Sequence, residues 1–195
     1  PYKSLLDMVT RVNLKNVNKR SLESLIMAGA FDFDKNTHRG MWFEQDPREN
    51  NITNLEKAVR YGAGSQEEKN SLQVSLFGDA SAVEMPSPKF LSVAPWSELE
   101  KLRHEKDVVG FYVSGHPLDE FRFEIDAFCN VPINQLGDLT KLRGKDIAFA
   151  GIVTAANHRT TKSGKPFGIL VLEDYTGSSE LALFSDDYLK FKQYL

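Results

Sequence analysis

The chain has very little cysteine and no long run of apolar residues. Cys129 is the only cysteine among 195 residues, so a disulfide framework and a cysteine-based zinc site are both excluded. No apolar stretch approaches the length of a membrane span, and no signal peptide is visible. These absences predict a cytoplasmic protein in a reducing compartment, with no membrane partner.

Catalytic motifs are also missing. The sequence holds no phosphate-binding loop, dinucleotide fingerprint, nucleophile elbow or zinc-protease motif. His116 has no second histidine or cysteine at ligand spacing, which favours a turn residue over a metal ligand. The adjacent carboxylates at 173–174 and 186–187 have structural roles available at a turn and a helix start. The sequence therefore predicts no catalytic residue, metal site or cofactor in this chain.

A strong charge of either sign is absent as well. The formal net charge is −3, and 41% of the residues are hydrophobic. This balance is typical of a globular chain without a whole-chain signature of nucleic-acid binding, so any basic surface must be local. The length predicts one or two domains.

Two short helices with a polar turn between them are predicted at the start of the chain. Apolar residues repeat at helical spacing over 2–12 and 19–28. Asn18 is the expected N-cap of the second helix, and Gly29 is the residue expected to end it. The turn places cations beside a helix N-terminus, where outward-pointing amides favour phosphate. A DNA contact and a solvated turn between packed helices are both open. The residues predicted to contact duplex DNA are Lys15, Asn18, Lys19 and Arg20.

A polar tract with a short apolar peptide follows the helical part. A capping box formed by Thr53 and Glu56 opens a helix that is expected to stop at Gly62. Two adjacent large apolar residues then lie in polar, Gly-containing and Pro-containing surroundings, which is typical of a peptide that waits for a partner pocket. The peptide, expected to be extended when free, is Gln73, Val74, Ser75, Leu76 and Phe77.

This peptide resembles the short motif by which bacterial replication and repair proteins hold the ring-shaped sliding clamp. In that mode Gln73 would hydrogen-bond at the rim of a pocket, and Leu76 with Phe77 would fill an apolar cleft. A plain linker strand is the alternative, because five degenerate positions recur by chance.

The apolar period changes to two after Gly144, which predicts strands. The first strand is expected to begin there and to run to about residue 154, with a turn over 157–166. Strands over 167–173 and 180–184 precede a last helix. Three meandering strands followed by a helix is the order of an OB-fold, whose last two strands are missing from this sequence.

The predicted turn between the first two of these strands is basic. In OB-folds this hairpin often contacts single-stranded nucleic acid, and an aromatic beside it can stack on a base. A basic hairpin that only keeps a sheet edge from pairing is the alternative. The residues predicted to contact single strands are Arg159, Lys162, Lys165 and Phe167.

The predicted fold class is α+β, with an N-terminal helix-hairpin-helix part, a flexible linker and a C-terminal partial OB-fold β-barrel. The expected parts are 1–61 for the helices, 62–95 for the linker with its peptide, 96–140 for a helix and an irregular connector, and 141–195 for the N-terminal part of the OB-fold. The helix of the third part is expected to begin at a capping box of Ser97 and Glu100 and to end at Gly110.

Three stretches, residues 12–32, 100–121 and 151–184, resemble the C-terminal part of the alpha subunits of bacterial DNA polymerase III. These are the replicative polymerases of the C family, and QVSLF stands at the family's clamp-peptide position. The resemblance implies a non-catalytic region that tethers the polymerase to the sliding clamp, contacts duplex and single-stranded DNA, and works among other replicase subunits. An OB-fold module of another nucleic-acid enzyme is the alternative.

The resemblance also implies what lies outside this sequence. The family's palm, whose carboxylates bind Mg²⁺, is expected upstream of Pro1, so that polymerisation would belong to the parent protein and not to this piece. Both ends are expected to be cuts in a longer chain. One departure is visible, because the turn at 15–18 lacks the Gly-x-Gly typical of such hairpins.

Overall fold

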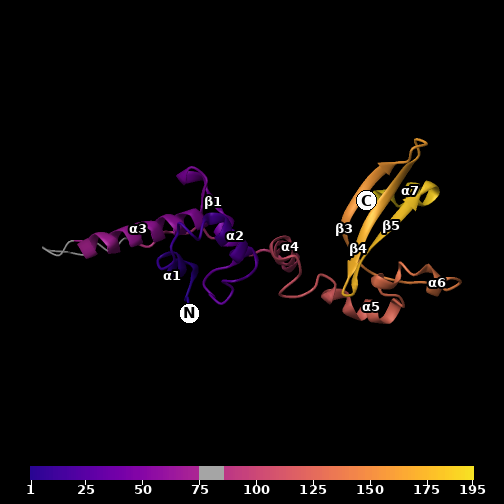
Figure 1. Ribbon diagram of the computed structural model, residues 1–195, viewed down its shortest axis with the longest axis horizontal. Coiled ribbons are helices and arrows are strands. Elements are labelled where there is room, and N and C mark those ends of the chain that lie inside the picture. The colour runs from indigo at the N-terminus through magenta and orange to yellow at the C-terminus, as the bar shows by residue number, and fades with distance from the viewer. Residues whose placement is uncertain (75–85) are drawn as a thin grey trace. The chain divides into compact units, whose positions relative to one another are not determined.

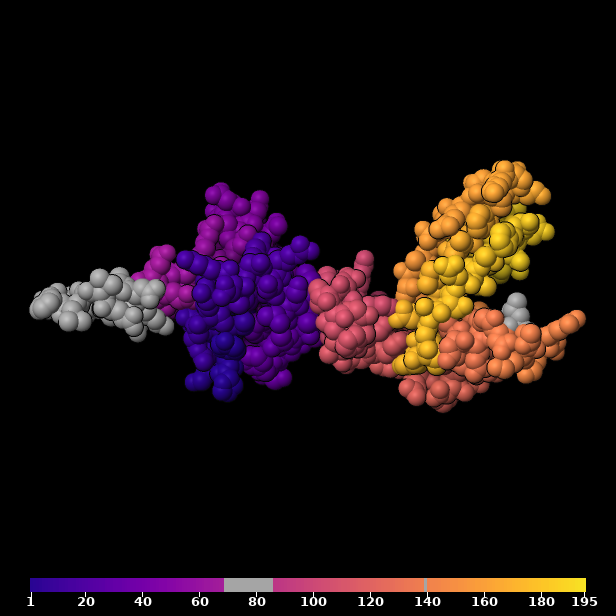
Figure 2. Space-filling model, viewed as in Figure 1, coloured from indigo at the N-terminus to yellow at the C-terminus, as the bar shows by residue number. Residues whose placement is uncertain are grey.

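The chain folds into two compact units, Pro1–Ser114 and Gly115–Leu195, in a computed structural model (Figure 1, Figure 2). The structure describes residues 1–74 and 86–195, and for residues 69–74 and 139 it describes the backbone alone. The first unit is mostly helical and the second is built on an antiparallel sheet, which confirms the α+β class.

The first unit begins with the predicted helical hairpin. The Asn18 cap and the turn at Gly29, whose φ is +80°, are where the sequence predicted them. The first helix is shorter than predicted because Thr10 already forms its C-cap. The elements are α1 (Leu5–Val9), α2 (Lys19–Met27), a 3₁₀ turn (Arg39–Phe43), β1 (Gln45–Asp46), a 3₁₀ turn (Pro47–Glu49), β2 (Ile52–Thr53), α3 (Asn54–Val74) and α4 (Glu98–Val109).

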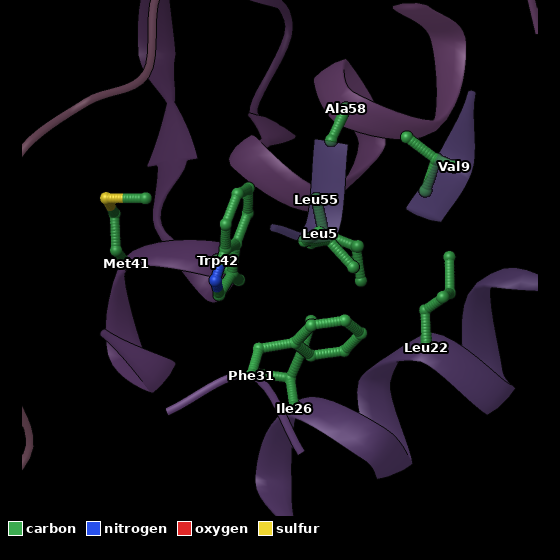
Figure 3. Packing of buried hydrophobic residues seen from close by; sticks show 9 residues of the cluster. All are labelled: Leu5, Val9, Leu22, Ile26, Phe31, Met41, Trp42, Leu55 and Ala58. Carbon is green, nitrogen blue, oxygen red and sulfur yellow. The ribbon is translucent and has the colours of Figure 1, made fainter. Parts of the chain in front are cut away.

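One apolar core holds this unit together (Figure 3). It joins side chains from α1, α2, α3 and the 3₁₀ turn at 39–43, and its largest member, Trp42, is 2% exposed. Each large apolar side chain taken out of water contributes about 1.5–3 kcal/mol before the entropy cost of folding. The core residues are Leu5, Val9, Leu22, Ile26, Phe31, Met41, Trp42, Leu55 and Ala58.

The helix that begins at the Thr53–Glu56 capping box does not stop at Gly62, and this prediction was wrong. The box itself is confirmed, since the Thr53 amide donates to Glu56 Oε2 at 2.8 Å and the Glu56 amide donates to Thr53 Oγ1 at 3.2 Å. The helix α3 continues to Val74. Gly62 serves a close approach instead of a helix end, because a Cβ there would lie 2.5 Å from the carbonyl oxygen of Val9.

The residues after position 85 return to the first unit. Asn54, at the start of α3, forms two hydrogen bonds with the backbone of Leu91. Its Nδ2 donates to the Leu91 carbonyl at 2.9 Å, and its Oδ1 accepts from the Leu91 amide at 3.0 Å. The indole of Trp96 stacks on Phe43 with ring centroids 5.3 Å apart, and the His104 ring lies 4.2 Å from it. Part of the segment predicted as linker therefore packs on the helical core.

The helix α4 begins at the predicted capping box of Ser97 and Glu100 and ends at Gly110, whose φ is +93°. A buried ion pair fixes it, with Arg39 Nη1 2.8 Å from Glu105 Oε1. The other oxygen of Glu105 accepts hydrogen bonds from the amides of Val113 at 2.7 Å and Ser114 at 2.8 Å. The carboxylate thus fastens the last residues of the unit to its interior.

The second unit consists of a three-stranded antiparallel meander in the order β3-β4-β5 with short helices around it. Its first strand begins at Ile152, later than the alternating pattern predicted, and extends into the residues predicted as a turn. Further upstream the Ala148 carbonyl instead accepts the amides of Asn130 and Val131. The elements are a 3₁₀ turn (Asp119–Phe121), α5 (Arg122–Phe128), a 3₁₀ turn (Ile133–Gln135), α6 (Leu139–Leu142), β3 (Ile152–Thr160), β4 (Pro166–Asp174), β5 (Gly177–Phe184), α7 (Ser185–Phe191) and a 3₁₀ turn (Lys192–Tyr194).

The helix α7 and the residues after it cover one face of this sheet. A Cβ on Gly168 would lie 2.5 Å from Leu195 Cδ1, and His158 Nδ1 lies 3.0 Å from the hydroxyl of Tyr188. Side chains alternate between the two faces along a strand, so the neighbours of Gly168 along β4 point to the opposite face. This face carries Phe167, which pairs with Phe184 across the sheet.

The turn between β4 and β5 organises the segment before the sheet. Asp174 Oδ2 accepts a hydrogen bond from the Ile133 amide at 2.8 Å, while its Oδ1 accepts from the Thr176 amide at 2.7 Å. Tyr175 donates its hydroxyl hydrogen to Asp119 at 2.8 Å, and the ring of His116 lies 4.2 Å from the Tyr175 ring. His116 is a turn residue, as predicted, and packs on this corner.

Candidate nucleic-acid and partner interfaces

The polar turn between α1 and α2 is folded by hydrogen bonds of its own. The Asn13 carbonyl oxygen accepts from the amides of Asn16 and Val17, both at 3.0 Å. The Asn13 Oδ1 accepts a third hydrogen bond, from the Lys15 amide at 3.0 Å. The expectation that the turn amides point outward to phosphate was therefore wrong for residues 15–17, because the turn uses these N–H groups itself.

Asn18 is engaged at the start of α2. Its Oδ1 accepts hydrogen bonds from the amide and the hydroxyl of Ser21, at 2.9 and 3.1 Å. The capping role predicted for Asn18 is confirmed. This oxygen is a hydrogen-bond acceptor and cannot bind a phosphate oxygen, so a phosphate contact of the Asn18 side chain would use the hydrogens on Nδ2.

The three predicted cations of the hairpin differ in their surroundings. Lys19 Nζ lies 2.9 Å from Glu56 Oε1 and 3.6 Å from Glu23 Oε1. The hydrogen bond with Glu56 raises the pKa of Lys19, and the same bond lowers the pKa of Glu56. Lys15 and Arg20 are exposed, and within the described part of the chain neither is seen in an ion pair. The unbalanced positive charge of the hairpin therefore lies on Lys15 and Arg20.

The predicted clamp peptide begins inside a helix. Gln73 and Val74 are the last two residues of α3, so the expectation of an extended free peptide was wrong for these two positions. Ser75, Leu76 and Phe77 lie outside the described residues. The clamp contact of the whole peptide therefore remains a prediction.

A side chain that the sequence reasoning overlooked joins α3 to the hairpin. Gln66 Nε2 donates to the carbonyl oxygens of Val9 at 2.7 Å and Val12 at 2.8 Å. Val9 is the last residue of α1 and Val12 lies three residues further on, where backbone acceptors have no partner within the helix. No local pattern in the sequence signals this contact, because it joins residues more than 50 positions apart.

The basic hairpin of the second unit is a compact turn that presents its cations to solvent. The Thr161 amide donates to the Lys165 carbonyl at 2.8 Å, and Gly164 adopts a φ of +81°. Arg159 lies at the end of β3 and not in the turn, directly opposite Phe167. All three predicted cations, Arg159, Lys162 and Lys165, are exposed.

Phe167 is not the outermost ring beside this hairpin. It stacks on Phe184 with ring centroids 5.2 Å apart and an interplanar angle of 16°. Phe167 is half-buried, whereas Phe184 is 52% exposed. Because directly opposed residues of neighbouring strands share a face, Arg159, Phe167 and Phe184 form one row on the face opposite α7. Phe184 is thus a candidate contact for single-stranded nucleic acid, and it is identified by the strand register and not by the sequence.

Metal-ligating groups do not gather in the part of the chain that the structure describes, where no cluster of three or more His, Cys, Asp or Glu side chains is suited to hold an ion. Within residues 1–74 and 86–195, no helix has both the length and the apolar character needed to span a bilayer.

The chain is similar over its length to proteins of one kind. Residues 1–41 match the family of helix-hairpin-helix motifs. The whole chain is 31% identical to the DNA polymerase III subunit alpha of Vibrio cholerae serotype O1, and 34% identical to that of Escherichia coli strain K12. Over 94% of the chain, the subunit alpha of Treponema pallidum is 32% identical.

These matches confirm the resemblance drawn from the sequence motifs. The chain covers only 16% of the length of the Vibrio cholerae and Escherichia coli relatives, and 15% of the Treponema pallidum one. The likeness therefore concerns one region of these long subunits.

Proposed function

We propose that this chain, which is similar throughout to one region of the bacterial DNA polymerase III alpha subunits, is a non-catalytic tethering region of a replicative DNA polymerase. The observation that carries the proposal is the similarity over the entire chain to subunits of that name in distant bacteria. The helix-hairpin-helix motif at residues 1–41 supports a DNA-binding part within it. DNA replication in the cytoplasm is the corresponding cellular role.

Three contacts make up the proposed tether. The peptide Gln73–Phe77 holds the sliding clamp, a proposal supported by its motif and by its place at the end of α3. The hairpin approaches duplex DNA with Lys15 and Arg20, whose charges no carboxylate balances among the described residues. The face bearing Arg159, Phe167 and Phe184 approaches single-stranded DNA, and the partial OB-fold is the architecture that we infer for it.

The chemistry of nucleotide transfer is assigned to the parent polymerase. We assign the Mg²⁺ ions and their carboxylates to the part of the parent subunit that this chain, which covers 16% of the length of its relatives, does not include. Contacts with other replicase subunits are part of the proposal but are not assigned to particular residues.

The proposal is tested by titrating a bacterial sliding clamp with the chain and following binding at equilibrium by isothermal titration calorimetry. We expect binding that is lost when a synthetic Gln73–Phe77 peptide is present in excess. A chain that gives no binding signal at clamp concentrations well above micromolar would overturn the tethering function. It would leave an OB-type module of another nucleic-acid enzyme as the function to test.

A further inference from the structure

The helix that leads to the predicted clamp peptide is fastened to the predicted DNA-binding hairpin. We propose that Gln66 is a positioning residue, which fixes α3 as a rigid arm between the two contacts. The inference rests on the proposed function, since it concerns how the clamp contact is held relative to the duplex contact. The contacts that support it lie wholly in the helical unit, among described residues.

Gln66 closes the end of α1 with both hydrogens of one amide. Its Nε2 donates to the carbonyl oxygens of Val9 and Val12 at 2.7 and 2.8 Å, and the side chain is half-buried. A single group that binds two acceptors fixes α3 against sliding and against rotation about its own axis. A shorter or apolar side chain would leave the two carbonyls without this donor.

Two further contacts join α3 to the hairpin. At Gly62, α3 approaches α1 so closely that a Cβ on this residue would lie 2.5 Å from the Val9 carbonyl oxygen. Near its start, Glu56 of α3 binds Lys19 of α2 at 2.9 Å. The arm is therefore in contact with both helices of the hairpin, at separate points along its length.

Beyond Gln66 the helix continues without a break to Val74, and Figure 1 shows it extending past α1. Gln73 lies seven residues after Gln66, which corresponds to about 10 Å along a helix axis. A continuous helix transmits direction as well as distance. The start of the clamp peptide is thus held at a set distance and angle from the hairpin.

A fixed distance and direction between the clamp contact and the duplex contact changes the affinity that the two weak contacts reach together. When a clamp encircles the duplex that the hairpin touches, the second contact forms at an effective concentration set by the connection between the sites. A rigid arm of the right length and direction raises this concentration, and an arm of the wrong direction lowers it. The quantity to measure is the coupling ratio, which we define as the affinity for a clamp loaded on duplex DNA divided by the affinity for the clamp alone.

Insertions after Glu68 test the rigidity of α3 and leave the contacts of Glu56, Gly62 and Gln66 in place. Two alanines placed after Glu68 turn the following residues by about 200°, whereas four alanines turn them by about 40°. We expect the unaltered chain to show a coupling ratio of about ten or more. The two-alanine insertion should reduce this ratio toward one, and the four-alanine insertion should keep most of it.

Gln66→Ala tests the positioning residue itself, with Gln193→Ala as a matched control at an exposed position of the other unit. We expect Gln66→Ala to lower the coupling ratio several-fold while the affinity for the clamp alone stays unchanged, and the control to change neither. Circular dichroism establishes that each variant is folded, and the insertions remain informative if Gln66→Ala is not.

The outcomes separate this inference from the proposed function. If the chain does not bind the clamp alone, the proposed function fails. If it binds the clamp alone but the coupling ratio is one, or the two insertions act alike, the rigid arm is overturned and the clamp contact stands.

Discussion

Glu105 accepts hydrogen bonds from Arg39 and from the backbone beyond its own helix, and its side chain is fully buried. Burial by itself would raise the pKa of Glu105, but the hydrogen bonds from Ser114 and Arg39 outweigh it and the pKa is lowered. We predict that Glu105→Gln destabilises the helical unit by about 1–3 kcal/mol, because an amide nitrogen cannot accept the hydrogen bonds from Val113 and Ser114. Arg39 keeps its ion pair with Asp32 at 2.6 Å, so the guanidinium does not become an unpaired charge. Urea unfolding followed by circular dichroism measures the loss.

The same carboxylate predicts a pH dependence. A group with a lowered folded pKa contributes stability above its unfolded pKa of about 4.3, and this contribution is lost as the pH falls through the folded pKa. The stability of the unaltered chain should therefore fall below about pH 4 and approach that of Glu105→Gln. Glu98→Gln, at a surface pair with Lys101, is the control and should change stability little. If the free energy of unfolding had the same pH dependence in the unaltered chain and in Glu105→Gln, the loss of stability at low pH would not come from Glu105.

The hairpin cations are predicted to act unequally on DNA. Lys15→Ala with Arg20→Ala should flatten the dependence of log affinity on log salt for duplex DNA by about two units, roughly 0.9 for each phosphate that is no longer neutralised. Lys19→Ala should flatten it much less, because Glu56 and Glu23 already balance that charge. Fluorescence anisotropy over a series of salt concentrations measures the slopes. Equal effects of Lys15→Ala and Lys19→Ala would show that DNA displaces the carboxylates.

The stacked pair on the sheet predicts which ring meets a base. Phe184→Ala should weaken binding of single-stranded DNA by about 1–3 kcal/mol, because the exposed ring offers its face. Phe167→Ala should act mainly on stability, since its ring is covered by Phe184. Phe123→Ala, at a ring that is 79% exposed on α5, is the control for removing a surface phenylalanine. Single-strand affinity that is unaffected by Phe184→Ala would remove the sheet face from the interface.

The clamp peptide gives the most direct prediction. Burial of Leu76 and Phe77 in a clamp pocket contributes about 3–6 kcal/mol, and ordering the segment costs about 2–5 kcal/mol. The isolated contact should therefore be of about micromolar affinity or weaker. Leu76→Ala with Phe77→Ala should abolish binding measured by calorimetry, with an almost unchanged melting temperature. Retained clamp affinity would contradict the assignment, and a large fall in melting temperature would show that the pair belongs to a core.

Local signals in the sequence predicted local structure well. The Asn18 cap, the capping boxes at Thr53 and Ser97, and the turn at Gly110 depend on residues three or four positions apart, so their geometry follows from spacing alone. The helical hairpin and the order of the three strands were confirmed for the same reason, because each arises from a short apolar period.

Contacts between distant residues were beyond such reasoning. Gly62 and the polar residues after it predicted a linker, yet Gln66 finds its acceptors at Val9 and Val12, far away in the chain. In the same way, only the register of β4 with β5 shows that Phe184 covers Phe167. The motif alone identifies the clamp peptide, and its bound geometry stays a prediction.

The placement of the indole rings has a spectroscopic consequence. Trp42 in the apolar core and Trp96 between Phe43 and His104 are the two tryptophans of the chain, and both belong to the first unit. Emission excited at the red edge of the absorption band therefore reports the surroundings of that unit alone. The tyrosines and the amide bands report both units, so the difference between the two signals isolates the melting of the strand meander without any added label.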